Sequence, residues 1–89
     1  IYLEDAPPQL TALRDAAKAG DMPAVVRLAH ALKSASHNVG ASQLGERCRQ
    51  LEQLGKSGAT EDARSMVSTL DSHFRLLRAR LLHVIEVAA

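Results

Sequence analysis

The C-terminal third of the chain carries apolar residues at alternating steps of four and three, and this pattern constrains the fold more than any other feature. The apolar positions are 63, 67, 70, 74, 77, 81, 84 and 88. Such spacing aligns apolar side chains along one side of an α-helix, where they form the seam by which a helix packs in a bundle. The pattern predicts a long helix that begins near Thr60, with part of it projecting past the bundle.

Three shorter helices are predicted before this one, because Gly, Pro, Asp, Ser and Thr interrupt the chain at regular intervals. We expect these helices at about residues 5–19, 22–39 and 42–54. Pro7 and Pro8 are tolerable only in a first turn, where a missing N–H would have been unpaired anyway. Asp21 and Thr60 are the expected N-caps of the second and fourth helices, and Gly40 is expected to end the second with a positive φ.

The fold class follows from these four helices and the short connections between them. Neighbouring helices joined by short loops run antiparallel, so we predict an all-α protein, an antiparallel up-down-up-down four-helix bundle. The sequence has one Tyr, one Phe and no Trp, which favours helix over sheet. We expect residues 1–89 to form one domain. The chain starts at Ile1 instead of Met, and we expect it to be a fragment of a longer protein.

Charge and cysteine content exclude several classes of function. The net charge is only +1, with acids and bases interspersed, so we expect neither nucleic acid nor a membrane as a direct partner. A single cysteine suits a reducing cytoplasm, and no apolar run is long enough to cross a bilayer. We therefore expect a cytoplasmic domain that is monomeric in isolation. The chain also lacks a Gly-rich phosphate loop, so an ATP site is not expected.

His30 is the strongest candidate for a functional residue. On a helical wheel it lies about 140° from the centre of the apolar face of its helix, with Lys33 and His37 close to it, so we expect it to face solvent. An exposed neutral imidazole can attack a phosphoryl group, and Lys33 can supply positive charge to the phosphoryl oxygens. A lone exposed histidine is more often an ordinary surface residue, so this interpretation depends on its surroundings.

The third helix carries a second group of polar candidates. Leu44, Cys48 and Leu51 form its expected core face, with Cys48 as a small core filler. Arg49, Glu52 and Lys56 share one flank, at spacings of three and four residues. Glu52 and Lys56 could equally form an ordinary surface ion pair, a reading that the spacing alone leaves open.

The segment from His30 to Ala41 resembles the phosphoacceptor motif of histidine-containing phosphotransfer (HPt) domains, which is roughly His-x-Leu-Lys-Gly-Ser-Ser-x-x-x-Gly-Ala. Two positions depart from that motif, since Ser34 replaces a glycine and Ala35 replaces a serine. Both replacing residues are small, so we expect that a partner protein can still dock beside His30. The matching positions are His30, Leu32, Lys33, Ser36, Gly40 and Ala41, and downstream Cys48, Leu51, Glu52 and Leu54-Gly55-Lys56.

This resemblance implies a phosphorelay carrier with His30 as the phosphoacceptor. It implies that Glu52 accepts a hydrogen bond from the non-reacting nitrogen of His30, and that Lys56 helps to neutralise the phosphoryl group, with Arg49 a weaker candidate. The implied partners are receiver domains, which would supply Mg²⁺, so no cofactor is expected on this chain. Family context suggests a parent hybrid sensor histidine kinase, with this domain at its C-terminal end and the kinase in the inner membrane, although a stand-alone shuttle would look similar.

Two alternatives from other classes remain open at this stage. One is a four-helix docking module that has kept the shape of the family and lost its chemistry. The other is metal binding, since His30 and His37 lie two turns apart on one face of a helix. The sequence has no Glu-x-x-His pairs of the di-iron type and no Cys-x-x-Cys, so we expect no metal site. His73 and His83 are expected at the rim or in solvent.

Overall fold

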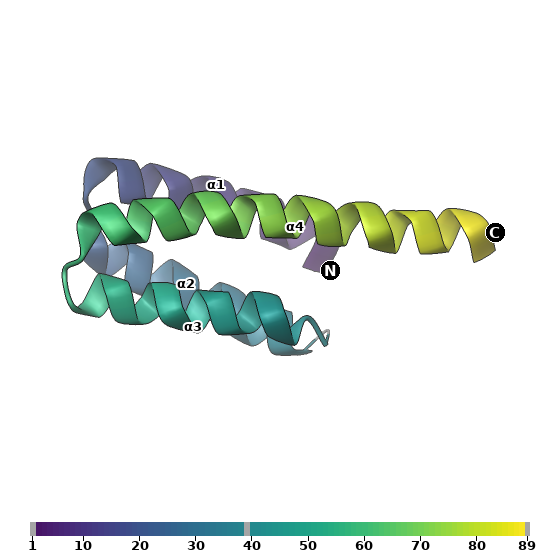
Figure 1. Ribbon diagram of the computed structural model, residues 1–89, viewed down its shortest axis with the longest axis horizontal. Helices are drawn as coiled ribbons and strands as arrows, with labels where there is room; N and C mark the ends of the chain where they lie inside the picture. The colour runs from purple at the N-terminus through teal and green to yellow at the C-terminus, as the bar shows by residue number, and fades with distance from the viewer. Residues whose placement is uncertain (1, 39, 89) are drawn as a thin grey trace.

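The computed structural model describes the backbone at residues 2–38 and 40–88 and the side chains at residues 5–38 and 40–83. This part of the chain forms four helices and no strand: α1 (Tyr2–Ala19), α2 (Met22–Asn38), α3 (Ser42–Lys56) and α4 (Thr60–Ala88). Consecutive helices run antiparallel, with α1 beside α4 and α2 beside α3 (Figure 1). The all-α four-helix bundle expected from the sequence is therefore confirmed.

The helix ends differ from the predicted ones at two places, and a third prediction falls outside the described residues. Helix α1 begins at Tyr2 and not at residue 5, and α3 continues to Lys56, so Gly55 and Lys56 are helical and not part of a loose connection. Helix α2 ends at Asn38 in the described part, and the predicted last residue, Val39, lies outside it. Glycine has a low helix propensity, but Gly55 is buried against α2, and this packing outweighs that propensity.

The two prolines of α1 lie inside the helix, so the prediction that they occupy its first turn was wrong. Each proline removes one helical hydrogen bond, because it has no backbone N–H. Burial of the flanking residues offsets this loss, since Ala6 and Leu10 are only 1% and 4% exposed.

Two of the expected caps are present and one is not. The side chain of Asp21 accepts a hydrogen bond from the backbone N–H of Ala24 at 3.2 Å, as expected of an N-cap. Gly40 has a φ of +79°, the left-handed conformation that ends a helix at low cost for glycine. Thr60 is already within α4, and its hydroxyl donates to the carbonyl of Gly58 at 3.4 Å. The assignment of Thr60 as a cap was therefore wrong by one residue.

One apolar core runs through the bundle, and every helix contributes to it. Its buried members are Ala6, Leu10, Leu13, Ala17, Met22, Val25, Ala29, Leu32, Leu44, Cys48, Leu51, Ala63, Val67, Leu70 and Phe74. The α4 seam is buried from Ala63 to Phe74, whereas Leu81 is 38% exposed. The helix therefore projects past the bundle in its second half (Figure 1), as the sequence predicts. A helix of 29 residues is about 43 Å long, which accounts for most of the 45 Å length of the protein.

Polar contacts connect α1 to α4 at the edge of this core. Arg14 of α1 donates to Asp71 of α4, with 3.0 Å between Nη2 and Oδ1. The guanidinium of Arg64 donates to the backbone carbonyl of Ala17 at 2.9 Å, near the C-terminus of α1. Carbonyls in the last turn of a helix lack helical partners, so this contact also caps α1.

Glycines bring α2 and α3 close together. A Cβ at Gly55 would lie 2.8 Å from Cγ2 of Val26, and a Cβ at Gly45 would lie 2.7 Å from Nε2 of His37. Contacts this short do not occur in real packing, so a side chain at either position would force Val26 or His37 to move. The two glycines lie near opposite ends of α3, and the helix is held against α2 along the whole segment between them.

Cys48 occupies the middle of this contact and has no exposed surface. Burial raises the pKa of its thiol to about 12, with the ammonium of Lys33 acting weakly in the opposite direction. The thiol is therefore neutral and is part of the core, which confirms its predicted role as a core filler.

None of the described helices contains an apolar stretch long enough to span a membrane. In α4, the longest of them, arginines interrupt the apolar residues.

The seam of α4 can be tested at Leu70, which has no exposed surface. Leu70→Ala should lower the free energy of unfolding by about 3 kcal/mol, because it removes buried methyl groups and leaves a cavity. Leu76→Ala is the matched control, since Leu76 is 59% exposed and its loss should change stability by about 0.5 kcal/mol or less. Urea denaturation followed by circular dichroism measures both, and equal losses would contradict the assigned bundle seam.

Candidate functional site

The imidazole of His30 stands on the outer surface of α2, with its side chain 62% exposed. The helical wheel predicts this orientation, because the buried residues Ala29 and Leu32 lie on the opposite side of the helix. One ring nitrogen is engaged, since Nδ1 lies 2.9 Å from Oε1 of Glu52 on α3. The ring is therefore held at one nitrogen and open to solvent at its other edge.

Glu52 is the only charged residue that is buried in the described part of the chain, with 6% of its surface exposed. Its two oxygens have separate partners. Oε1 faces Nδ1 of His30, and Oε2 accepts a hydrogen bond from Nζ of Lys33 at 3.0 Å. A buried carboxylate needs partners to offset its loss of hydration, and one turn of α2 supplies both of them.

These contacts determine the charge of the carboxylate. The hydrogen bond from Lys33 lowers the pKa of Glu52 below its ordinary value of 4.5. Burial opposes this, and the hydrogen bond from His30 and the positive charges of Lys33 and Lys56 lower the pKa further. Glu52 is therefore ionised at neutral pH.

The ionised carboxylate selects the tautomer of His30. A carboxylate can only accept hydrogen bonds, so Nδ1 of the imidazole must carry the proton that lies between the two residues. Nε2 then has a free lone pair, and it is the nitrogen on the side away from Glu52. The geometry thus presents a nucleophilic nitrogen to solvent, next to the bundle but not inside it.

Lys33 points toward Glu52 and is 23% exposed at its side chain. In this arrangement it neutralises the carboxylate instead of extending beyond the imidazole. Lys56 is exposed and has no direct contact with His30 or Glu52 in the described part of the chain, although its charge acts on Glu52. The structure therefore brings His30, Lys33 and Glu52 into contact and leaves Lys56 at the margin.

Arg49, the weaker candidate, is engaged elsewhere. Its guanidinium forms two-pronged hydrogen bonds to Glu46, with 2.6 Å between Nη2 and Oε1, on the exposed surface of α3. This arrangement does not support a part for Arg49 in the His30 site. His37 lies two turns beyond His30, and its ring covers Gly45 of α3. No cluster of three or more His, Cys, Asp or Glu residues suited to a metal occurs among the residues whose placement is described.

A nucleophilic imidazole next to an ionised carboxylate and an ammonium suits transfer of an anionic group, and comparison with known proteins points to the same chemistry. The family model described as Hpt domain matches residues 1–84. This chain belongs to the Hpt domain family. Hpt domains are phosphocarriers in phosphorelays and not enzymes, and they interact with receiver domains of response regulators. The chain is accordingly a phosphotransfer carrier. Neither the curated proteins nor the solved structures contain a significant match to it.

Sequence analysis missed one contact of this Hpt domain, the pair between Lys33 and Glu52. The spacing of His30 and Lys33 is compatible with this contact, because residues three apart on a helix lie on the same face, but the spacing does not identify Glu52 as the partner of Lys33. The sequence instead predicts that the ammonium of Lys33 extends into solvent beside His30. The roles of His30, Lys33, Glu52 and Lys56 in phosphoryl transfer remain predictions.

The charge of Glu52 can be tested through the pH dependence of stability. A group whose pKa is lowered by folding contributes stability above its unfolded pKa, and this contribution is lost as the pH falls through its folded pKa. Glu52→Gln should therefore lower the free energy of unfolding by about 2 kcal/mol at pH 7. The difference from the wild type should shrink as the pH falls through 4.5, the ordinary pKa of the carboxyl, and further below it.

Glu61→Gln is the matched control, because Glu61 is 87% exposed at its side chain and its partner, Arg64, lies on the same helix. Denaturant titrations at each pH measure both variants. A Glu52→Gln deficit that stays constant across this pH range would show that the carboxylate is not held ionised by its partners.

Proposed function

We propose that His30 is the phosphoacceptor of this Hpt domain, taking a phosphoryl group from the aspartate of one receiver domain and passing it to the aspartate of another. The observation that carries this proposal is the contact between Nδ1 of His30 and the buried Glu52 at 2.9 Å. That contact holds the ring in a single tautomer while 62% of the side chain stays accessible to a partner. Such positioning lowers the entropic cost of reaching the transition state.

In the proposed forward step, Nε2 of His30 attacks the phosphorus of the receiver's phosphoaspartate. The N–P bond forms, the P–O bond to the aspartate breaks, and its electron pair leaves with the aspartate carboxylate. The ring then carries a positive charge while Nδ1 keeps its proton, and the carboxylate of Glu52 stabilises that charge through the existing hydrogen bond. Transfer to a second receiver reverses these changes and returns the electron pair to Nε2.

We propose different roles for the two lysines near the imidazole of His30. We assign Lys33 to the phosphoryl oxygens once they are present, since its ammonium is already held within one turn of His30 by Glu52. Lys56 adds charge from the margin of the site. We assign Mg²⁺ to the receiver and no cofactor to this chain.

A receiver must approach closely for such a transfer, and the surface around His30 allows it. Ala31 and Ser34 are small, exposed residues beside His30 on the outer face of α2. We propose that this face of α2 is the centre of the receiver contact, with the α1 side of the bundle as its margin. An interface of modest area suits a transient encounter.

The wider setting of the domain is also a proposal. We place it in the cytoplasm, at the C-terminal end of a hybrid sensor histidine kinase, as a monomer that touches neither nucleic acid nor membrane through this site. A docking module without phosphoryl chemistry is the alternative, and phosphorylation assays distinguish the two.

The phosphoacceptor is tested by incubating the domain with a receiver that carries radiolabelled phosphoaspartate. His30→Gln should abolish label on the domain, because it removes the nucleophilic nitrogen. His37→Gln, two turns away on the same helix, should retain labelling at the wild-type level. Label on wild-type protein should be lost in acid, as expected of phosphohistidine, and persistence of label in His30→Gln would refute the assignment.

Lys33 is tested by the rate of transfer. Lys33→Ala should slow phosphoryl transfer roughly tenfold, because one charged hydrogen bond to the phosphoryl oxygens is lost. Lys18→Ala, which removes a lysine at the far end of α1, serves as the control and should leave the rate unchanged. Rapid-quench kinetics with circular dichroism of each variant separates slower transfer from unfolding. An unchanged rate in Lys33→Ala would remove Lys33 from the mechanism.

A further inference from the structure

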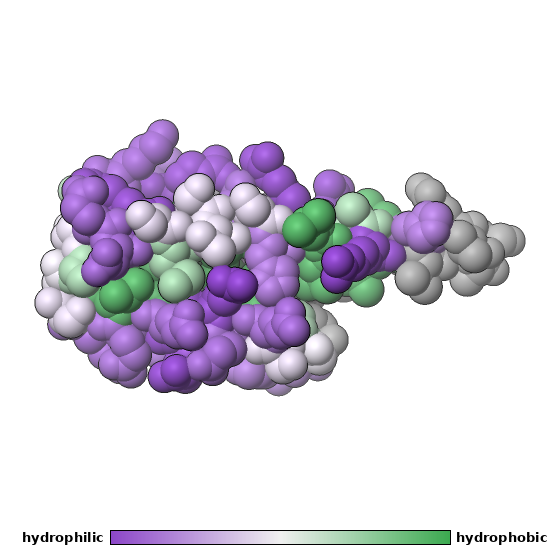
Figure 2. Space-filling model, in the orientation of Figure 1, coloured by the Kyte–Doolittle hydropathy of each residue, from purple (hydrophilic) through white to green (hydrophobic). Residues whose placement is uncertain are grey.

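Beyond Phe74, the seam of α4 becomes progressively more exposed in the described part of the chain. Leu77 is partly buried at the end of the bundle, and further out Leu81 and Leu82 are 38% and 39% exposed. Figure 2 shows hydrophobic surface where the helix leaves the bundle, next to strongly hydrophilic surface. Leu76 adds a side chain that is 59% exposed. We call residues 73–83 the α4 arm.

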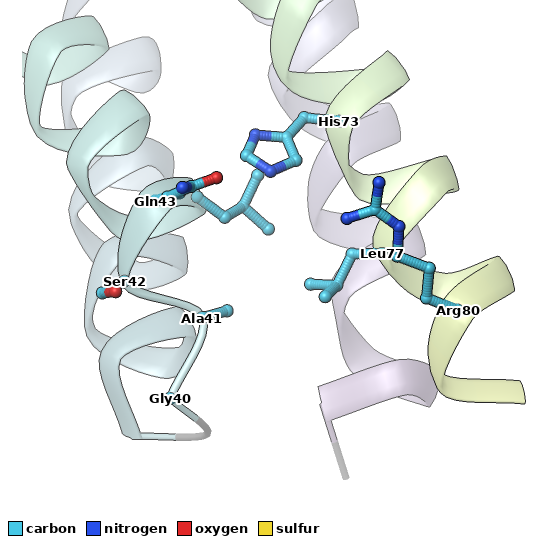
Figure 3. A pocket seen from close by; sticks show the side chains of 8 residues that line it. Gly40, Ala41, Ser42, Gln43, His73, Leu77 and Arg80 are labelled. Carbon is cyan, nitrogen blue, oxygen red and sulfur yellow. The ribbon is translucent and has the colours of Figure 1, made fainter. Parts of the chain in front are cut away.

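A groove of about 270 Å³ runs between the α4 arm and the turn that joins α2 to α3. Figure 3 shows the side chains of His73 and Leu77 extending from α4 toward α3, while the side chain of Arg80 lies along α4. The opposite wall is formed by the turn and the first residues of α3, which include Ala41 and Leu44. The groove is therefore mixed in character, with Ala41, Leu44 and Leu77 beside polar residues, and Arg80 adds a positive charge to its α4 wall.

The charge of the α4 arm has a single sign. Three arginines and two histidines occur between positions 72 and 83, with no acidic residue. Arg75 pairs with Asp71, one turn earlier. Arg78 and Arg80 form no ion pair with any residue whose side chain is described. An apolar stripe with unneutralised arginines beside it attracts a surface of opposite charge.

The positions of these basic residues indicate which occupant fits. Taking Phe74, Leu77 and Leu81 as seam positions, the residues that flank the seam are His73, Arg78 and Arg80. Flanking residues of a helical seam decide which helix pairs with it. Two copies of this arm would set basic residues against basic residues, which disfavours a second copy of the chain as the occupant.

We propose that the α4 arm and its groove bind an acidic amphipathic helix of a partner protein, with apolar residues at four-and-three spacing and Glu or Asp at the positions that flank them. The occupant would continue the bundle seam past Phe74 and would place its carboxylates against Arg78 and Arg80. An anionic bilayer shares the required charge. A groove closed on one side by the α2–α3 turn, however, accepts a rod-shaped helix better than a flat surface. This binding site is separate from His30, which does not line the groove.

Arg47 adds a further positive charge beside the groove, through a contact with His73. The guanidinium of Arg47 donates to Nδ1 of His73 at 3.0 Å, so this nitrogen acts as an acceptor. Arg47 does not line the groove itself, but it lies beside the groove through this contact and retains its positive charge, because its partner His73 accepts through a neutral nitrogen.

The test uses a fluorescent peptide of about three heptads, with Leu at the seam positions and Glu at the flanking positions. A second peptide carries Lys in place of Glu. The Glu peptide should bind the domain in an anisotropy titration, and the Lys peptide should not. Arg78→Glu with Arg80→Glu should weaken binding of the Glu peptide about tenfold and should create binding of the Lys peptide.

The matched control reverses two charges elsewhere, Lys18→Glu with Arg27→Glu, and should leave binding of the Glu peptide unchanged. Circular dichroism verifies that every variant is folded. Equal affinity of the Glu peptide for both double variants would overturn the proposal, as would a failure of that peptide to bind. Binding to phosphatidylserine vesicles without binding to the peptide would overturn the proposal and identify a membrane as the occupant of the groove. A dimer in sedimentation that is lost in the Arg78→Glu, Arg80→Glu variant would overturn it and identify a second copy of the chain as the occupant.

Discussion

A single buried carboxylate organises the surface on which this Hpt domain presents its chemistry. Glu52 lies in the contact between α2 and α3, where a charge without partners would destabilise the fold. His30 and Lys33 provide those partners from one turn of α2. The same contacts hold the imidazole in one tautomer and keep an ammonium within a turn of it. The requirement to satisfy a buried charge thus also positions the proposed nucleophile.

The rest of the bundle keeps that contact in place. Two glycines of α3 remove the side chains that would separate it from α2, and Glu52 lies between them along the helix. The apolar core holds the helices at this spacing, and Arg14 and Arg64 fasten α1 to α4 on the other side of the bundle. In its proposed role, His30 needs no cavity, because a receiver would bring the remaining machinery to an exposed surface.

Much of this arrangement is encoded in local patterns that can be read from the sequence. Apolar spacing predicts four helices, the buried stretch of the α4 seam and the outward direction of His30, because these depend only on helical periodicity. The predicted helix ends were less accurate, because they depend on tertiary packing. Burial of Ala6 and Leu10 stabilises α1 on both sides of its two prolines, and the packing of Gly55 against α2 extends α3. The bond from Lys33 to Glu52 could not be predicted from periodicity, because it depends on how closely and in which register two helices meet.

The core position of Cys48 gives this domain an internal reporter of its own motion. The thiol has no exposed surface, and its pKa of about 12 leaves almost no thiolate while the helices are packed. An alkylating reagent can therefore reach a reactive sulfur only during moments when the core around α3 opens. The alkylation rate of an unmodified chain consequently measures how often α3, the helix that carries Glu52, separates from the helices packed against it. That frequency is a property of the free carrier, between one encounter with a receiver and the next.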